Sequence, residues 1–314
     1  MAGYGHTRPV YTRRVTRDAL SRRLRHDKPQ PGSGRFSLTG ADIALFEAIN
    51  RHGPLPTNYL AALLKEHHDS RGYLQWKLTR LYHGSSNMPP LLSRPAQQFQ
   101  SYAARYQHLV YDLAEPAKAI LADRGTEVIE RSDHFIHRLM ASCAGGSIFL
   151  GCKGAGLRYI SRAEILKKSG RPLEARTPLG SIIPDDLFGV QYRDGSFRFF
   201  AVEIDRQTEG VARTKRVSNS FAGKLSRYGA LMEGQQFRNS WAIPSLLVLT
   251  VTTSMPRMRN LIAAVAKEIA PPLRERFLFK TWDAFAAPWR IPEVECSLLT
   301  EAWQRESAPF AINV

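Results

Sequence analysis

Cysteine is scarce in this chain, and long apolar runs are absent. The three cysteines, Cys143, Cys152 and Cys296, are an odd number and lack the close spacing of a metal-binding pair. A disulfide framework is therefore not expected, which favours a reducing, cytoplasmic compartment. No apolar run reaches the roughly 18 residues of a membrane span, and the basic N-terminus lacks the apolar segment of a secretory signal. We expect no membrane association.

Acidic residues are also few relative to basic ones. The 314 residues carry 44 Lys and Arg against 28 Asp and Glu, so the formal net charge is +16. Such a surplus attracts polyanions and favours nucleic acid as the partner, although any acidic surface would also attract it. The hydrophobic fraction of 43% is typical of a globular protein, and the length suffices for two domains.

The first 35 residues combine many arginines with very little apolar sequence. Residues 1–35 contain only two acidic side chains and end in a segment rich in proline and glycine. This composition predicts a disordered basic arm. Arg13 and Arg14 would bind phosphates without sequence preference, in a salt-sensitive way. A solvated tail or a mitochondrial-type targeting peptide are the alternatives.

Residues 36–125 have the pattern of a winged helix-turn-helix domain. Thr39, Thr57 and Ser70 each precede an amphipathic segment and would cap three successive short helices. A short apolar run at 91–93 and an alternating run at 106–113 then predict the hairpin of a wing. A helix from about residue 115 to 124, stopped by a glycine, would close the unit.

The third helix of this unit is the predicted recognition helix. Its apolar stripe leaves a basic outer surface, on which Arg71, Gln75 and Arg80 would reach base edges and Lys77 a phosphate. An ordinary three-helix bundle with a solvated basic face, or a protein-binding module, would show the same pattern.

Residues 126–314 are expected to form a second domain after a charged linker at 126–133. A helix starts at about residue 134 and is interrupted at Gly145-Gly146. His134 and His137 lie one turn apart on it. Zinc-binding histidines on a helix are more often four residues apart, so we interpret this pair as surface or core residues.

Two apolar runs farther on predict a β-hairpin with acidic ends. Residues 182–190 and 197–205 flank an Arg-Asp-Gly-Ser turn. Residues two apart on a strand share a face, so Glu203 and Asp205 point the same way. Asp185 or Asp186 would join them from the other strand, and the alternation alone leaves both open.

Carboxylates gathered in this way repel one another unless a cation neutralises them. A hard divalent ion, Mg²⁺ or Mn²⁺, with Asp185, Glu203 and Asp205 as ligands is the simplest solution. Such an ion can polarise a phosphate and activate water. Lys224 borders the apolar face of the next helix and would stabilise charge on the phosphate as the fourth catalytic residue.

Two further features flank this lysine. A basic loop before the helix offers Lys215 and Arg216 as DNA-binding residues. Tyr228 lies on the apolar stripe of the helix, which favours packing over a role as covalent nucleophile.

A proline-aspartate pair entering one strand, an acidic-x-acidic end to the next and a lysine on the following helix resemble the PD-(D/E)xK restriction-endonuclease-like core. More narrowly, residues 36–260, with the segments IIPDDLFGV, FFAVEIDRQTE, KLSRY and LLVLTVTT, are similar to the replication-relaxation proteins of plasmids and other mobile elements. These are related to mobilisation relaxases. Asp185 matches the PD aspartate and Glu203 the next acidic position. Asp205 replaces the expected lysine, and Lys224 would substitute for it.

The resemblance implies an α+β protein in which a winged helix-turn-helix precedes a restriction-endonuclease-like domain with a central mixed sheet. It implies binding to double-stranded DNA, nicked or single-stranded at an origin, and metal-dependent nicking there. We expect such a protein to be associated with the nucleoid or a plasmid in bacterial cytoplasm and to form a homodimer. The alternative is a non-catalytic replication initiator or transcriptional regulator with a degenerate nuclease-like domain.

Overall fold

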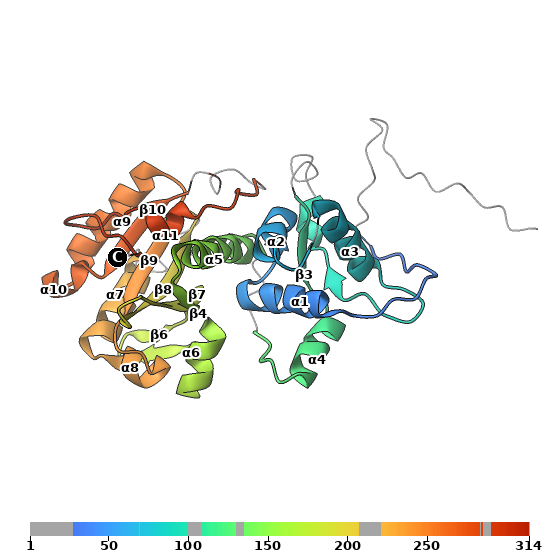
Figure 1. The fold of residues 1–314 in the computed structure, drawn as a ribbon. Helices are drawn as coiled ribbons and strands as arrows, with labels where there is room; N and C mark the ends of the chain where they lie inside the picture. Colours follow the sequence, from blue (N-terminus) through green and yellow to red (C-terminus); the bar gives the residue numbers. More distant parts are fainter. Residues whose placement is uncertain are drawn as a thin grey trace, which may run out of the picture.

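A computed structural model describes residues 28–68, 70–99, 108–129, 135–206, 221–282, 284 and 290–313. The protein is α+β, as predicted, with a helical N-terminal region and a mixed sheet in the C-terminal region (Figure 1). Most of the predicted basic arm lies outside the described residues. Its last residues contact the C-terminal end of the helix at Arg71–His83. The Gln30 N–H donates to His83 Nδ1 (2.9 Å) and the Gly32 N–H to the Gly84 carbonyl (3.4 Å).

The N-terminal region alternates helices with very short strands. Its elements are α1 (Gly40–His52), β1 (Leu55–Pro56), α2 (Thr57–Leu63), α3 (Arg71–His83), β2 (Leu92–Ser93), a 3₁₀ turn (Ala96–Phe99), β3 (Val110–Leu113) and α4 (Glu115–Asp123).

Two of the three predicted helix caps are confirmed. The Thr39 N–H and hydroxyl both donate to Asp42 Oδ2 at 2.7 Å, which fixes the start of α1. Ser70 Oγ accepts the Tyr73 N–H at 3.2 Å and starts α3. The third prediction is wrong: Thr57 is the first residue of α2, and its hydroxyl donates to the Leu109 carbonyl, which ties α2 to the segment before β3.

The predicted hairpin is present as β2 and β3, which pair antiparallel with Leu92 opposite Leu113. Strand β1, which the sequence did not indicate, adds to the other side of β3, so the small sheet has the order β1-β3-β2. Residues 100–107, in which the predicted second strand began, lie outside the described part of the chain.

The C-terminal region is built on a five-stranded sheet. Its elements are α5 (Phe135–Ala155), β4 (Arg158–Ile160), α6 (Arg162–Ser169), β5 (Ala175–Thr177), β6 (Gly180–Ile182), β7 (Asp186–Gln191), β8 (Phe197–Asp205), α7 (Phe221–Glu233), α8 (Gln236–Trp241), β9 (Leu247–Thr252), α9 (Met255–Glu268), α10 (Pro271–Arg274), β10 (Phe277–Thr281) and α11 (Ser297–Thr300). Helix α6 and strands β5 and β6 were not predicted from the sequence.

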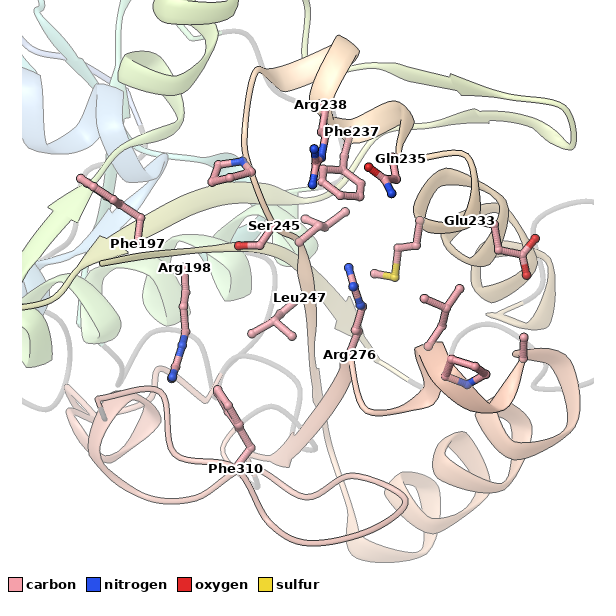
Figure 2. Close-up of a pocket in the computed structure, with 16 residues that line it drawn as sticks. Phe197, Arg198, Glu233, Gln235, Phe237, Arg238, Ser245, Leu247, Arg276 and Phe310 are labelled. Carbon is pink, nitrogen blue, oxygen red and sulfur yellow. The ribbon is translucent and has the colours of Figure 1, made fainter. Parts of the chain in front are cut away.

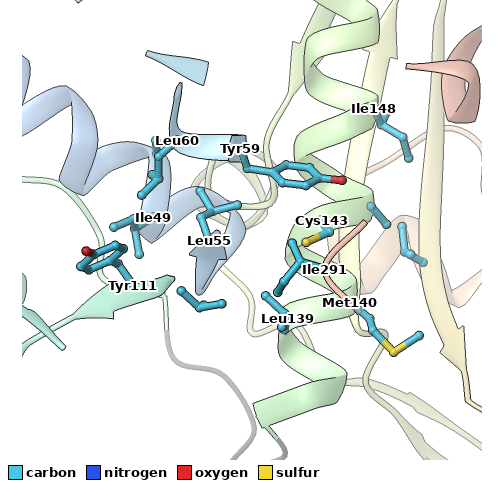
Figure 3. Packing of buried hydrophobic residues seen from close by; sticks show 14 of the residues in the cluster. Ile49, Leu55, Tyr59, Leu60, Tyr111, Leu139, Met140, Cys143, Ile148 and Ile291 are labelled. Carbon is cyan, nitrogen blue, oxygen red and sulfur yellow. The ribbon is translucent and has the colours of Figure 1, made fainter. Parts of the chain in front are cut away.

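Helix α5 is continuous through Gly145 and Gly146, so the predicted interruption is wrong. The glycines instead allow close packing: a Cβ on Gly146 would lie 3.2 Å from the Tyr59 ring of α2. Apolar residues from both regions meet around α5 in one buried cluster (Figure 3). The helix is long and apolar enough to cross a membrane, but 72% of its most apolar window is buried, as in a core helix.

The large sheet is mixed, with the order β10-β9-β8-β7-β4. Strands β4, β7 and β8 are antiparallel neighbours, whereas β8, β9 and β10 run parallel. The predicted turn between β7 and β8 is present, and Gly195 adopts a positive φ of 83° there.

Alternation along β8 gives the sheet two different faces. Val202 and Ile204 belong to the apolar cluster around α5. Phe199 and Ala201 pack in a second cluster with α7, α8 and α9. Glu203 and Asp205 continue the line of this second face, so both carboxylates point toward α7 and α9 where β8 ends.

Candidate active site

Glu203 is the buried centre of the candidate site. Its side chain is 4% exposed and is held from α7, the helix that follows the hairpin in sequence. The Tyr228 hydroxyl donates to Glu203 Oε1 at 2.6 Å, and Lys224 Nζ lies 3.4 Å from Oε2. The prediction that Lys224 borders the buried face and reaches the hairpin is thus confirmed. Tyr228 combines the expected packing with a polar contact that the sequence did not indicate.

Asp185, the residue immediately before β7, stands opposite Glu203 of β8. Asp186 pairs with Val202 in the ladder between β7 and β8, and the same register, continued by one residue, puts Asp185 opposite Glu203. Directly opposed residues have Cβ atoms about 4.5–5.5 Å apart. The Asp185 N–H donates to the Val202 carbonyl (3.0 Å), and its Oδ2 accepts the Ile204 N–H (2.8 Å). These contacts hold Asp185 directly opposite Glu203.

The choice between Asp185 and Asp186 is therefore decided by the strand register. Asp186 points to the opposite face, where Arg162 Nε lies 3.8 Å from its Oδ1 and both side chains are buried. Asp185 Oδ1 instead lies 2.7 Å from His137 Nε2 of α5. His137, which the sequence suggested was a surface or core residue, belongs to the site. His134 lies outside the described residues.

Burial and the two neighbouring carboxylates set the charge of the site. Burial, reinforced by the charge of Asp185, raises the pKa of Glu203 to about 7, against the opposing influence of Lys224 and Tyr228. Burial lowers the pKa of His137, but the Asp185 carboxylate outweighs it, so that pKa is raised overall. Burial and the Glu203 charge raise the pKa of Tyr228 well above its ordinary value. At neutral pH Tyr228 is a phenol.

Asp205 does not join this group, although it shares the face of Glu203. Arg257 of α9 donates from Nε and Nη2 to the two oxygens of Asp205, both at 2.8 Å, and the Thr252 hydroxyl donates at 2.8 Å. The prediction of Asp205 as a metal ligand beside Asp185 and Glu203 is contradicted, because its carboxylate is fully engaged in a buried ion pair. The sequence did not indicate Arg257, because it contacts Asp205 from 52 residues farther along the chain.

Across the described ranges, no three His, Cys, Asp or Glu side chains are arranged to hold a metal ion. The carboxylates that do meet are a pair, Asp185 and Glu203.

The predicted DNA-binding residues fall into three groups. Arg71 and Gln75 are exposed on α3, and Arg80 is partly exposed there. Lys77 does not face outward as predicted. It is 4% exposed, and its Nζ lies 2.9 Å from Asp42 Oδ2, so it holds α3 to α1 instead of facing a phosphate. The other predicted residues lie outside the described part of the chain, namely Arg13, Arg14, Lys215 and Arg216.

A pocket of about 780 Å³ lies at the opposite end of β8 (Figure 2). Phe197, in the wall of the pocket, lies six positions before Glu203, which corresponds to roughly 20 Å along the strand. The pocket is lined by arginines and aromatic rings that include Arg238, Arg276 and Phe310, and it contains no side chain of the acidic site.

Comparison with known families gives one match. The model of a family described as replication-relaxation matches residues 46–246, which is more than half of the chain and includes Asp185, Glu203 and Lys224. No curated protein and no solved structure matches the chain.

Proposed function

The chain belongs to the replication-relaxation family, and we propose that it binds DNA through its N-terminal region and nicks it at the Asp185–Glu203 pair. Family membership associates it with the replication or relaxation of plasmids and other mobile elements. The finer proposal rests on the geometry of two regions, the helices and small sheet at residues 40–123 and the acidic end of β8.

For the N-terminal region we propose a winged helix-turn-helix. The order α1-β1-α2-α3-β2-β3, with an antiparallel sheet β1-β3-β2, supports this assignment. In such a unit α3 is the recognition helix and the β2–β3 connection is the wing. Arg71 and Gln75 are exposed on α3 and available to DNA, and the chain's charge of +16 supplies long-range attraction.

For the C-terminal region we propose a restriction-endonuclease-like phosphodiester-cleaving site. One observation carries the proposal: Asp185 enters β7 after a proline, stands opposite Glu203 in the adjacent strand, and Lys224 of the next helix lies 3.4 Å from Glu203. These are the positions of the PD aspartate, the acidic residue and a lysine relocated to the helix. The side chains of Asp185 and Lys224 are 18% and 24% exposed, so the site is partly open to solvent.

The residues present suit Mg²⁺ or Mn²⁺ as the cofactor. Mg²⁺ commonly binds through one or two carboxylates, keeps several waters and takes further ligands from phosphate oxygens. Asp185 and Glu203 would hold it. Burial and the Asp185 charge raise the pKa of Glu203, and a bound cation would offset both effects. When bound, the ion would polarise the phosphate and activate a water molecule.

The chain's own side chains have distinct tasks in this proposal. Lys224 offers its ammonium group to the charge that develops on the phosphate. His137 fixes the orientation of Asp185 through the 2.7 Å contact, and Tyr228 does the same for Glu203. His137 and Tyr228 are positioning residues, because their contacts are with the carboxylates.

A plasmid-relaxation assay tests the proposal. Supercoiled plasmids carrying candidate origins are incubated with the full chain and Mg²⁺ or Mn²⁺, and nicked circles are separated on a gel. We expect nicking by the wild type and a loss of at least about 100-fold in Glu203→Gln and Lys224→Met, the range expected when one charge-stabilising group is removed.

Lys153→Met is the matched control, since Lys153 is a half-exposed lysine whose partner is the exposed Glu66. It should nick as the wild type does. Nicking that persists in Glu203→Gln, or that is absent from the wild type with every origin and either ion, would sink the catalytic proposal.

A second candidate is a non-catalytic replication initiator or transcriptional regulator. It is favoured by the internal partners of both acidic residues of β8: Glu203 is bound by Tyr228 and Lys224, and Asp205 by Arg257. This candidate predicts DNA binding without nicking. The binding would survive Glu203→Gln and weaken in Arg71→Ala, with a cost of about 1–3 kcal/mol if that contact is to a base edge.

A further inference from the structure

The outward face of α3 exposes two large aromatic side chains. Tyr73 is 44% exposed and Trp76 is 51% exposed, although rings of this size are usually buried. Both lie on the side opposite the apolar stripe of Leu74 and Leu78. We call Tyr73, Trp76 and Arg80 the α3 aromatic face.

The two rings are held in place before any partner binds. Tyr73 and Trp76 are centred 5.6 Å apart, with their planes 32° from parallel. The guanidinium of Arg80 lies 5.4 Å from the Trp76 ring and 5.0 Å from the Phe36 ring. Arg80 Nη2 also donates to the Arg35 carbonyl at 2.7 Å. The segment before α1 thus fixes Arg80, and Arg80 supports the indole.

There is open space beside the indole. Gly72 lies one turn before Trp76 on the same side of the helix. A Cβ added at Gly72 would have Ser70 Oγ, at 4.0 Å, as its nearest neighbour. A planar group can therefore lie against Trp76 without meeting a side chain of the preceding turn.

The chemistry of the face is typical of nucleic-acid-binding surfaces. Helix α3 has the sequence RGYLQWKLTRLYH, which contains no acidic residue. Arg80 lies beside the Trp76 ring, in a chain of net charge +16. Alternating basic and aromatic side chains are typical of surfaces on which bases stack while phosphates are neutralised.

The centre of the face is better suited to base faces than to base edges. Trp76 offers a single N–H donor, whereas reading a base edge in a duplex requires paired donors and acceptors such as those of Gln75. A stacked duplex exposes few base faces, while unpaired bases expose them fully. A ring pair at the centre of the helix surface is a platform for unpaired bases.

We propose, building on the DNA-binding function above, that the α3 aromatic face binds DNA that contains unpaired bases, through stacking on Trp76 and Tyr73. The substrate class is a melted, nicked or single-stranded segment flanked by duplex. Base stacking on aromatic side chains is tolerant of sequence, so the face recognises the unpaired state of the strand.

Fluorescence polarisation in EDTA tests the proposal. The probes are a labelled duplex and the same duplex with a short internal bubble, titrated with the full chain. Stacking of one base is worth about 1–3 kcal/mol, so the wild type should prefer the bubble by at least about fivefold. Trp76→Ala and Tyr73→Ala should reduce that preference to near one while retaining duplex binding. Phe197→Ala, which removes another exposed ring from a distant strand, should keep it.

Intrinsic fluorescence gives a second measurement. Titration with the bubble should quench part of the tryptophan emission, and Trp76→Phe should remove that quenching while keeping part of the preference. Equal binding of duplex and bubble by the wild type overturns the stacking proposal but leaves DNA binding intact. Absence of binding to either probe overturns both. A preference unchanged in Trp76→Ala, or self-association lost in that variant, assigns the face to another role and also overturns the proposal.

Discussion

Glu203 and Asp205 are two residues apart on the same face of one strand, yet their surroundings differ in kind. Asp205 meets a bidentate arginine, Arg257, and the Thr252 hydroxyl, so both of its oxygens are paired with short contacts. Glu203 meets a neutral phenol, a lysine at 3.4 Å and a second carboxylate across the ladder.

The difference separates a structural ion pair, Asp205–Arg257, from the pair proposed as the metal site, Asp185–Glu203. The charge of Asp205 is balanced inside the protein by a guanidinium whose planar geometry suits a carboxylate. The Asp185–Glu203 pair carries two potential negative charges, and Lys224 is partly solvated. Carboxylate position on a strand is therefore insufficient evidence of a metal site, and what opposes each carboxylate decides its role.

The largest expected effect comes from breaking the buried ion pair between Asp205 and Arg257. Arg257→Met leaves Asp205 buried without its cation, and loss of one partner from a buried pair typically costs about 3–5 kcal/mol. The side chains of Arg257 and Asp205 are 12% and 6% exposed, so little solvent screening is available. Urea unfolding at pH 7 measures the change.

Arg158→Met is the matched control for that substitution. Arg158 and Glu164 form an exposed pair with side chains 62% and 46% exposed. Exposed pairs contribute about 0–1 kcal/mol, so this variant should unfold nearly as the wild type does. Adding Asp205→Asn to Arg257→Met should recover part of the loss. An Arg257→Met variant as stable as the control would show that Arg257 does not stabilise the buried Asp205 carboxylate.

The second prediction concerns how the stability contributed by the Asp185–Glu203 pair depends on pH. Because the folded-state pKa of Glu203 is raised from 4.5 to about 7, the folded protein holds this proton more tightly than the unfolded chain. The associated stability is fully present below about pH 4.5 and is lost as the pH rises through about 7, by on the order of 1–3 kcal/mol. Glu203→Gln cannot ionise and should lack this loss. Guanidinium unfolding from pH 4.5 to 8 compares the two, and parallel curves would contradict the assignment.

Much of this contrast was predictable from the sequence, because strand alternation and helix periodicity are local properties. The face shared by Glu203 and Asp205, the hairpin between β7 and β8 and the inward position of Lys224 follow from spacings of two and of three to four residues. The caps of α1 and α3 follow from single residues, Thr39 and Ser70.

What the sequence did not indicate depends on contacts between distant segments. Arg257 meets Asp205 across 52 residues, and His137 meets Asp185 across 48. No local pattern distinguishes these side chains from other surface arginines and histidines. Gly145 and Gly146 were interpreted as an interruption of α5, because helix propensity carries no information about the close approach of α1 and α2 that requires them.

The third prediction uses Mg²⁺ to sharpen the comparison. A ligand present at about ten times its Kd stabilises the folded state by about 1.4 kcal/mol. Thermal unfolding at pH 8, where Glu203 is ionised, should show this increase in the wild type and lose it in Glu203→Gln. Asp205→Asn should be less stable than the wild type yet respond to Mg²⁺ equally. A response lost only in Asp205→Asn would reverse the roles assigned to the two carboxylates.

The smallest expected effect distinguishes a positioning role for Tyr228 from a nucleophilic one. Tyr228→Phe removes the hydroxyl that donates to Glu203 at 2.6 Å, and a single hydrogen bond contributes about 1 kcal/mol of net stability. The hydroxyl is buried, and its pKa is raised well above the ordinary value, so it stays protonated and is a poor nucleophile. Nicking should fall by less than about tenfold, because Glu203 keeps its place in β8 and loses only one orienting contact. Complete loss of nicking in Tyr228→Phe, together with a protein–DNA adduct in the wild type that survives denaturation, would instead make Tyr228 the attacking group.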